Sequence, residues 1–265
     1  MSDLLEVAVA AARAAGEFLL ASRPASLQVA TKSTPTDVVT QMDTAAERLI
    51  GERLREQRPN DVILGEEGQD DGAAASSDRS KVRWIVDPID GTVNYLYAIP
   101  QWAVSIAAEV DGVVEAGAVL DPSKGELFTA VRGEGARLNG APIAVSRREE
   151  LALALVGTGF GYDAARRARQ SEVLTGVLPI VRDIRRLGAA SLDLCALACG
   201  RLDGYYERGL NLWDYAAAGL IAVEAGARVG GLNGRPASGE LYIAATPAVF
   251  EPLRDLLTGL EADRD

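Results

Sequence analysis

Residues 84–92 bring together the side-chain types that metal and phosphate chemistry require. The apolar run 84–86, rich in aromatic and β-branched types, predicts a short buried strand. Pro88 has no backbone N–H, so we expect this strand to end there with Asp87 at its carboxyl edge. One carboxylate is therefore expected at the point where a buried strand gives way to a turn.

A second carboxylate and the start of a helix follow at once. Gly91 permits a sharp turn, and Asp90 or Thr92 can cap a helix that opens at Thr92. Carboxylates attract hard cations, and the free N–H groups of a helix N-terminus attract phosphate. The segment therefore predicts metal-assisted phosphate chemistry.

Two other acidic clusters could complete such a site. Residues 62–64 form an apolar run that delivers Glu66 and Glu67 into a glycine-flanked turn. Asp214 lies at the start of an Ala-rich helical stretch, where the helix dipole favours a negative charge. Taken alone, each cluster is more often a surface turn or a helix cap. Their order around residues 87–92 favours a shared site.

Composition excludes several classes of enzyme. The chain of 265 residues contains no histidine, which rules out Ser-His-Asp triads, His-based zinc sites and imidazole general bases. Hydrolysis would have to rely on carboxylates, hydroxyls and metal. The formal net charge of −11 argues against nucleic acid or an anionic membrane as the main ligand. Bound divalent cations would reconcile this charge with an anionic substrate.

The two cysteines are expected to be buried core thiols of a cytoplasmic protein. Cys195 and Cys199 lie four residues apart in an apolar helical pattern, and without histidine we expect no zinc site. No basic region precedes the apolar run near the N-terminus, so we expect no signal peptide. No apolar run is long enough to span a bilayer.

Periodicity predicts a mixed α/β chain in two halves. The polar stretch 146–150 separates a half covering 1–146 from a half covering 147–265, in which strands and helices alternate. Helices are expected at 4–20, 43–58, 164–178, 190–200 and 213–225, and strands at 103–110, 113–120, 126–131, 153–157, 181–185 and 204–207. A mobile loop or loose hairpin is expected at 30–36, and a surface loop at 69–80.

Taken in order, these motifs resemble the inositol monophosphatase family of metal-dependent, lithium-sensitive phosphatases. The similarity extends from about Lys32 to Arg228. Segments 158–161 and 185–188 are typical of bacterial inositol-1-monophosphatases. The matching segments are Lys32, 37–40 with Asp43, 65–67, 84–94, 133–135, 139–140, Arg185 with 188–190, 203–207 and 213–214.

The resemblance implies a fold and an activity. The family shares an αβαβα five-layer sandwich with fructose-1,6-bisphosphatase, in the α/β class, and its members are usually homodimers. The implied reaction is the Mg²⁺-dependent hydrolysis of inositol-1-phosphate, a small phosphate ester, by a metal-activated water molecule. Most metal ligands would lie in 1–146, whereas 147–265 would supply one ligand and the substrate contacts.

The resemblance also assigns the ligands of two Mg²⁺ ions. Glu66, Asp87 and the carbonyl of Ile89 would hold the first ion. Asp87, Asp90 and Asp214 would hold the second. Oxygen ligands without histidine or a well-placed cysteine favour Mg²⁺ over zinc.

Catalytic groups follow from the same resemblance. Glu66 and Thr92 would orient the attacking water, and the N–H groups of Gly91 and Thr92 would bind the phosphate. Asp43 would support the Thr92 hydroxyl, although it could equally serve only as the cap of the helix that follows it.

Contacts to the substrate alcohol are expected on the other side of the site. Glu207 resembles the residue that binds inositol hydroxyls, and its alternative role is an ion pair with Arg208 or another cation. Arg185, Gly188 and Ala190 would line the same pocket, although the arginines here could instead face solvent or a second subunit.

One departure from the family bears on substrate preference. Many relatives carry an aromatic residue and a His-Gly pair before the proline that ends this loop, whereas residues 95–100 contain neither histidine nor glycine. The metal ligands are unaffected.

Alternative functions remain compatible with parts of the sequence. A haloacid-dehalogenase-type phosphatase would need its second aspartate two residues after the first, whereas Asp87 and Asp90 are three apart. Histidinol-phosphate, fructose-1,6-bisphosphate or phosphoadenosine-phosphate hydrolysis would use the same metal core. A non-catalytic regulatory role in transcription complexes, known for some bacterial relatives, could accompany catalysis.

Overall fold

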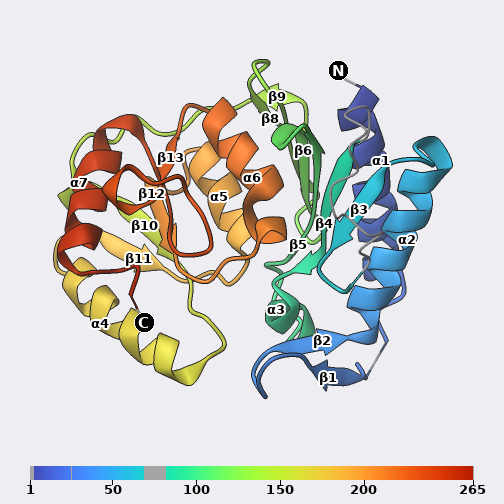
Figure 1. Cartoon of the computed structure of the whole chain (residues 1–265), viewed down its shortest axis with the longest axis horizontal. Helices are drawn as coiled ribbons and strands as arrows, with labels where there is room; N and C mark the ends of the chain where they lie inside the picture. Colours follow the sequence, from blue (N-terminus) through green and yellow to red (C-terminus); the bar gives the residue numbers. More distant parts are fainter. Residues whose placement is uncertain (1–2, 25, 69–81, 265) are drawn as a thin grey trace.

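The computed structural model describes residues 3–24, 26–68 and 82–264, so the loop expected at 69–80 lies outside the described residues. The described elements stack as five layers in the order helix, sheet, helix, sheet, helix (Figure 1). The expected α/β layered sandwich is confirmed. Each sheet is therefore covered by helices on both faces, which allows strands to be apolar on both sides.

The larger sheet is built from the first half of the chain. Its seven strands lie in sequence order, with β3 parallel to β4 and all other neighbours antiparallel. The three central strands agree with the sequence prediction, whereas the short β8 and β9 were not predicted. The strands are β3 (Val62–Gly65), β4 (Arg83–Asp90), β5 (Ala103–Val110), β6 (Val113–Asp121), β7 (Glu126–Val131), β8 (Ala136–Leu138) and β9 (Ala141–Pro142).

Strand β4 continues past the proline at which we expected it to end. The prediction that Pro88 terminates the strand is wrong, because pairing with β5 resumes at Asp90. Asp87 pairs with Ser105 and Asp90 with Ala103, so two residues of β4 face one residue of β5. This bulge accommodates a residue that has no N–H to donate, and bulges re-aim the side chains around them.

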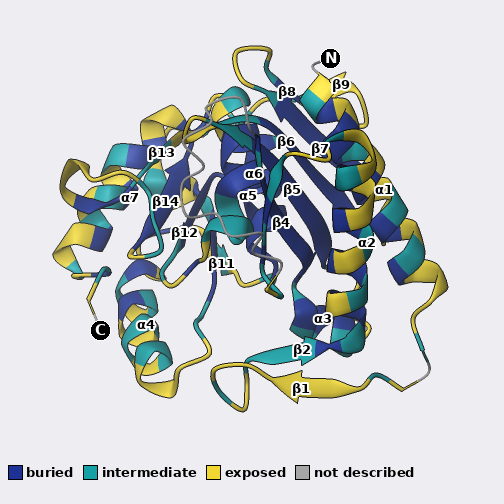
Figure 2. Cartoon of the chain, turned by 45° about the vertical axis from the view of Figure 1, so that its right-hand side comes forward, coloured by how far each residue is buried: buried dark blue, intermediate teal, exposed yellow. Residues whose placement is uncertain are grey.

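Two outer helices, α1 (Asp3–Ala21) and α2 (Gln41–Gln57), cover one face of the larger sheet. In α1 the buried residues recur every three or four positions, as in Leu5, Ala8, Ala12, Ala15 and Leu19. These side chains pack on β5 and β6, and both helices agree with the sequence prediction within two residues. A small antiparallel hairpin, β1 (Val29–Thr31) and β2 (Val38–Thr40), connects the two helices. Figure 2 shows that β1 is exposed while the central strands are buried.

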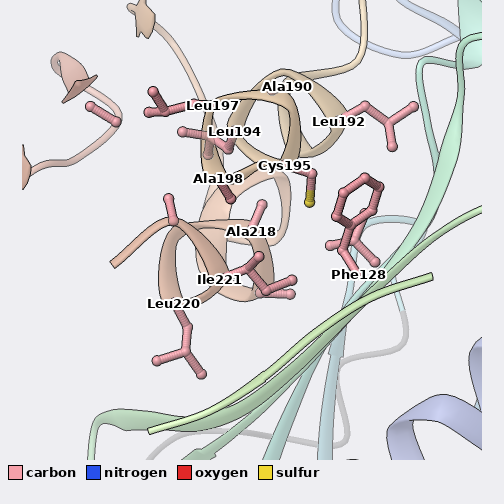
Figure 3. Close-up of a cluster of buried hydrophobic side chains, with 14 of the residues drawn as sticks. Phe128, Ala190, Leu192, Leu194, Cys195, Leu197, Ala198, Ala218, Leu220 and Ile221 are labelled. Atoms are coloured by element: carbon pink, nitrogen blue, oxygen red, sulfur yellow. The ribbon is translucent and has the colours of Figure 1, made fainter. Parts of the chain in front are cut away.

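The central layer consists of α5 (Ala190–Ala198) and α6 (Leu212–Glu224), which lie between the two sheets (Figure 1). Every residue of α5 is buried, as expected for a helix covered on both sides. Its apolar side chains join Phe128 of β7 and Ile221 of α6 in one cluster (Figure 3). Cys195 is buried in this cluster and Cys199 is partly buried, both as free thiols. Burial raises the pKa of Cys195 well above its usual value.

The smaller sheet comes from the second half of the chain. β10 lies parallel to β11 and β12, and β14 lies antiparallel to β12 and β13. Helices α4 (Ala164–Val177) and α7 (Pro247–Gly259) cover its outer face. The sequence did not predict β13, β14 or α7. None of the described helices is long and apolar enough to cross a membrane. The strands are β11 (Asp183–Arg185), β10 (Leu155–Thr158), β12 (Gly204–Glu207), β14 (Tyr242–Ala245) and β13 (Arg228–Gly230).

Candidate active site

A cavity of about 530 Å³ lies between the two halves of the chain. From the first half it is lined by the β1–β2 loop, the end of β3 and the turn after β4. From the second half it is lined by the ends of β10 and β12 and the starts of α5 and α6. Of the predicted site residues, the cavity-lining ones are Glu66, Asp87, Ile89, Asp90, Gly91, Thr92, Gly188, Ala190, Glu207 and Asp214.

The turn after β4 is shaped by Gly91. This residue has φ of 92° and precedes α3 (Thr92–Leu96), so the helix begins without the side-chain cap that we expected from Asp90 or Thr92. A side chain at Gly91 would lie 3.0 Å from the carbonyl oxygen of Gln101 and 3.2 Å from that of Gly188. The backbone conformation and the lack of space both require glycine here.

Asp43 contacts both the start of α2 and the turn after β4. Its Oδ2 accepts hydrogen bonds from the Thr40 backbone N–H at 2.8 Å and the Thr40 hydroxyl at 2.5 Å, which caps α2. The Thr92 hydroxyl lies 3.0 Å from Asp43 Oδ1 and 3.0 Å from the Ile89 carbonyl oxygen. The capping role and the contact to Thr92 therefore coexist. Burial raises the pKa of Asp43, and the hydrogen bonds from Thr40 and Thr92 oppose this rise.

The turn after β3 holds a tight group of charges. Lys32 Nζ lies 2.8 Å from Glu66 Oε1 and 2.5 Å from Glu67 Oε1. Burial and the charge of Glu66 raise the pKa of Glu67 to about 7, although the ion pair with Lys32 lowers it. Glu47 of α2 lies beneath the turn, where its Oε2 accepts the Glu67 N–H at 2.8 Å. Gly65 leaves the room that the Glu47 carboxylate occupies.

Sequence reasoning missed Glu47 in this turn. Its only signal was an acidic residue four positions after Asp43, on the face of α2 that turns towards the sheet. Glu47 is 2% exposed and does not line the cavity, so it supports the turn from beneath.

Asp90 joins the two halves of the molecule. Its Oδ2 accepts hydrogen bonds from the Ser191 N–H at 2.7 Å and the Ser191 hydroxyl at 2.5 Å, and its Oδ1 accepts the Ala190 N–H at 3.2 Å. These donors stand at the start of α5, where helix N–H groups lack intrahelical partners. Burial raises the pKa of Asp90 to about 6, although the bonds from Ser191 lower it. Ser191 was not among the predicted site residues.

Asp87 and Asp214 complete the acidic lining. Asp87 is 1% exposed, and burial together with the charges of Glu66, Asp90 and Asp214 raises its pKa well above the usual value. Asp214 lies in the first turn of α6, as predicted, and its Oδ2 accepts the Asn211 N–H at 2.6 Å. Burial and the charge of Asp90 likewise raise the pKa of Asp214. The carboxylates therefore repel one another across the cavity.

The donor set suits a hard divalent cation. Four carboxylates and a backbone carbonyl offer only oxygen ligands, and a cation would relieve their mutual repulsion. Among the described residues, however, no three acidic side chains are gathered around one point as metal ligands would be. Protein donors occupy part of this set, namely Lys32 at Glu66, Ser191 at Asp90 and Asn211 at Asp214, whereas the side chains of Glu66 and Asp87 lie within hydrogen-bond reach of each other.

The part of the cavity that we expected to contact the substrate alcohol differs from the sequence prediction at one arginine. Arg185 does not line the cavity, whereas the adjacent Arg186 does. Arg185 is exposed, donates to Asp183 Oδ2 at 2.6 Å and lines a separate cavity of about 270 Å³. Glu207 does line the main cavity, where it accepts a hydrogen bond from the hydroxyl of Tyr205.

The β1–β2 loop closes one side of the cavity through contacts with the second half. The hydroxyl of Thr36 donates to the Tyr162 carbonyl at 2.9 Å, and Arg167 Nη1 donates to the same oxygen at 2.8 Å. The predicted loop at 30–36 is thus the tip of a hairpin that is connected to the far side of the site.

Comparison with known sequences relates the whole chain to one family. Residues 1–261 match the profile of the inositol monophosphatase family. The chain is 47% identical over 232 residues to inositol-1-monophosphatase of Mycobacterium bovis, across 85% of this chain and 79% of that protein. It is 41% identical over 262 residues to Nus factor SuhB of Pasteurella multocida, across 97% of this chain and 96% of that protein.

Solved structures show the same fold. The extragenic suppressor protein SuhB of Bartonella henselae superposes with a TM-score of 0.89 at 37% identity, over 97% of this chain and 98% of that one. SuhB of Mycobacterium tuberculosis superposes with a TM-score of 0.82 at 42% identity, over 98% of both chains. Because sequence and fold agree over nearly the full length, the chain belongs to the inositol monophosphatase family.

Proposed function

We propose that the protein is a Mg²⁺-dependent phosphatase that hydrolyses inositol-1-phosphate to myo-inositol and phosphate. The observation that carries this proposal is the convergence of Glu66, Asp87, Asp90 and Asp214 on one cavity beside the Gly91 turn. A relative with 47% identity named inositol-1-monophosphatase supports the substrate. Membership of the family supports phosphate-ester hydrolysis more broadly.

Two Mg²⁺ ions would be held by the acidic lining. Glu66, Asp87 and the Ile89 carbonyl would hold one ion, and Asp87, Asp90 and Asp214 the other. Bound Mg²⁺ would neutralise phosphoryl charge and lower the pKa of the attacking water. Asp90 is 8% exposed and Asp87 1%, so both carboxylates lie where the local dielectric is low and electrostatic interactions are strong.

The chain itself would orient the reactants. The N–H groups of Gly91 and Thr92 would bind the phosphate at the start of α3, and Glu66 with the Thr92 hydroxyl would orient the attacking water. Asp43, 3.0 Å from that hydroxyl, would accept its proton in a hydrogen bond and so direct its lone pairs towards the water. Glu207 would accept a hydrogen bond from the leaving alcohol.

The test is a phosphate-release assay with several esters, in Mg²⁺ and after exhaustive chelation. We expect the highest kcat/KM with inositol-1-phosphate, loss of activity in chelator and recovery on adding Mg²⁺. If the enzyme prefers histidinol phosphate, fructose-1,6-bisphosphate or phosphoadenosine phosphate, that ester would replace inositol-1-phosphate as the proposed substrate. Full activity without metal would refute the proposed mechanism.

The chemistry of attack can be tested separately. Because water and not Asp87 or Asp90 is the proposed nucleophile, no phosphorylated enzyme should accumulate. Mass spectra of acid-quenched enzyme under turnover should show the unmodified chain. A phosphorylated aspartate would show that the reaction proceeds through a covalent intermediate.

A second candidate function is a regulatory binding role beside catalysis. The observation that favours it is the 41% identity to a protein named Nus factor SuhB. In a strain lacking the native gene, an Asp90→Asn variant without phosphatase activity would restore growth if binding is the essential role. Failure of this variant alongside rescue by the wild type would assign the essential role to catalysis.

We further propose that the protein is a cytoplasmic homodimer. The family resemblance supports the dimer, and the two free cysteines agree with a reducing compartment. Light scattering after size exclusion should give about twice the chain mass of 27.9 kDa. A single-chain mass at micromolar concentration would refute the dimer.

A further inference from the structure

Asp193 is a buried acid with no evident structural partner. It lies in α5 and is 1% exposed, yet no hydrogen-bond partner in the described residues reaches its buried Oδ1. Its side chain also lines the 530 Å³ cavity. A buried acceptor without a donor destabilises a fold, so such groups are uncommon unless they serve a ligand.

Asp203 is a buried carboxylate whose two oxygens both accept hydrogen bonds from within the fold. Its Oδ1 accepts a hydrogen bond from the Ser146 hydroxyl at 2.5 Å, and its Oδ2 accepts the Leu155 N–H at 2.8 Å. Arg148 lies 3.6 Å away as a counter-charge. Asp203 does not line the main cavity. The contrast with Asp193 indicates that the latter is not retained for the stability of the fold.

The surroundings of Asp193 direct it to the alcohol side of the site. Gly157 of β10 pairs with Tyr205 of β12, and a Cβ at Gly157 would lie 3.9 Å from the Cβ of Asp193. Just past the end of β10, a side chain at Gly159 would overlap the Glu207 carboxylate. Gly159 therefore leaves the space that Glu207 occupies, and Asp193 lies beside the same strand end, where it feels the charge of Glu207.

The charges around this pair agree with a site for neutral hydroxyl groups. Burial and the charge of Glu207 raise the pKa of Asp193, and burial raises the pKa of Glu207 to about 7. Arg186, which also lines the cavity, opposes both rises. Carboxyl groups with raised pKa values can accept hydrogen bonds from alcohols and, when protonated, can also donate one.

We propose that Asp193 is a specificity-determining residue that, together with Glu207, binds two hydroxyl groups of a polyol leaving group. This inference rests on the proposed phosphatase function and extends its alcohol site by one residue. It predicts a preference for phosphate esters of polyhydroxylated rings over esters of alcohols or phenols without further hydroxyls. Asp193 itself would not take part in phosphoryl transfer.

The experiment compares Asp193→Leu and Asp193→Asn with the wild type on inositol-1-phosphate and p-nitrophenyl phosphate. Asp193→Leu should raise KM for inositol-1-phosphate about tenfold or more, because a hydrogen bond to a charged or buried acceptor is lost. Its kcat and KM on p-nitrophenyl phosphate should stay within about twofold, since that ester lacks the hydroxyls. Asp193→Asn keeps an acceptor, so its KM should rise no more than about threefold.

Thermal unfolding separates recognition from a structural role. Asp193→Leu should raise Tm, because it removes a buried carboxyl without a partner. The matched control Asp203→Asn should lower Tm and leave KM unchanged on both substrates, because it weakens bonds within the fold only. A lower Tm for Asp193→Leu, or equal changes on both substrates, would overturn the proposal.

Binding gives a readout that does not depend on turnover. In calorimetric titration with the product myo-inositol, in Mg²⁺ and inorganic phosphate, Asp193→Leu should bind about tenfold or more weakly than the wild type. Unchanged affinity would overturn the role of Asp193 even if the enzyme is an active phosphatase. A wild-type chain without phosphatase activity would overturn the proposed function, and the titration would still decide whether Asp193 binds the polyol.

Discussion

Asp43 combines two functions that the sequence left as alternatives. One oxygen caps α2 through Thr40, and the other lies 3.0 Å from the Thr92 hydroxyl in the cavity wall. Both carboxylate oxygens have partners, so the group is held in one orientation although it is fully buried. A buried carboxylate with a fixed orientation is suited to direct the hydroxyl of a neighbour.

Replacing Thr92 should separate the hydroxyl from the shape of the side chain. Thr92→Val removes the donor to Asp43 but keeps the volume, and we expect kcat to fall about 10- to 100-fold with a lower Tm. Thr92→Ser keeps the hydroxyl and should retain most of the activity. Phosphate release and thermal unfolding measure both effects. Equal kcat values for the two variants would show that the hydroxyl has no role in catalysis.

The raised pKa of Glu207 predicts a pH-dependent stability. Its pKa of about 7 in the folded chain exceeds the usual 4.5, so the folded state binds the proton more tightly than the unfolded state. The resulting stabilisation is present below about pH 4.5 and is lost as the pH rises through about 7. Relative to Glu207→Gln, the wild type should therefore lose about 2–3 kcal/mol between pH 4.5 and pH 8.

Chemical denaturation in chelator measures this difference between Glu207→Gln and the wild type. Chelation keeps divalent ions out of the acidic lining. Parallel pH curves for the two chains would mean that Glu207 ionises as freely in the folded chain as in the unfolded one.

At the scale of single elements, the start of α2 fixes the carboxylate that contacts Thr92 in the cavity wall. Thr40 is the N-cap, its hydroxyl oxygen accepts the Met42 N–H at 3.1 Å, and the same hydroxyl donates to Asp43. A change in this capping box would therefore alter the orientation of Asp43 as well as the stability of the helix.

Thr40→Ala should reduce stability and activity together. Loss of an N-cap costs about 1 kcal/mol, and a less firmly held Asp43 should lower kcat by about 3- to 10-fold. Thr40→Ser keeps both hydrogen bonds and should match the wild type. Urea denaturation and phosphate release measure the two effects. A loss of stability with unchanged kcat would show that the cap does not position Asp43.

At the scale of the whole molecule, α5 and α6 lie between the two sheets, and the start of each helix contributes to the cavity. Asp214 lies in the first turn of α6, and Ser191 at the start of α5 donates a hydrogen bond to Asp90 of β4. The body of α6 packs so closely on β6 that a Cβ at Gly117 would lie 2.9 Å from the Ala217 carbonyl oxygen. The spacing of helix and sheet therefore affects the geometry of the site.

Gly117→Ala should disturb this packing. The added methyl group meets backbone atoms, which cannot rotate away, so we expect a loss of about 1–3 kcal/mol and a lower kcat through displacement of Asp214. Gly259→Ala is the matched control, because a Cβ at Gly259, the last residue of α7, meets nothing within 4 Å. Thermal unfolding should show a lower Tm only for Gly117→Ala. A neutral Gly117→Ala would mean that α6 can shift without loss.

Local patterns were sufficient for much of the fold. Helical periodicity located α1, α2, α4, α5 and α6 within about two residues, because amphipathic spacing and cap residues are short-range properties. The acidic motifs likewise placed Asp90 at the turn between strand and helix and Asp214 in the first turn of its helix. The short strands β8, β9 and β13 escaped prediction, since three or fewer residues carry little periodic signal.

Contacts between distant segments depended on packing that no local pattern encodes. The bond from Ser191 to Asp90 spans 101 positions, and the support of Glu67 by Glu47 spans 20. The strand continued through Pro88 because β5 pairs on both sides of the bulge, a neighbour that local propensity ignores. Arg186 rather than Arg185 lines the cavity, because successive side chains of an extended segment point to opposite sides. Residue types and their order thus identified the chemistry, whereas long-range packing selected which neighbours surround it.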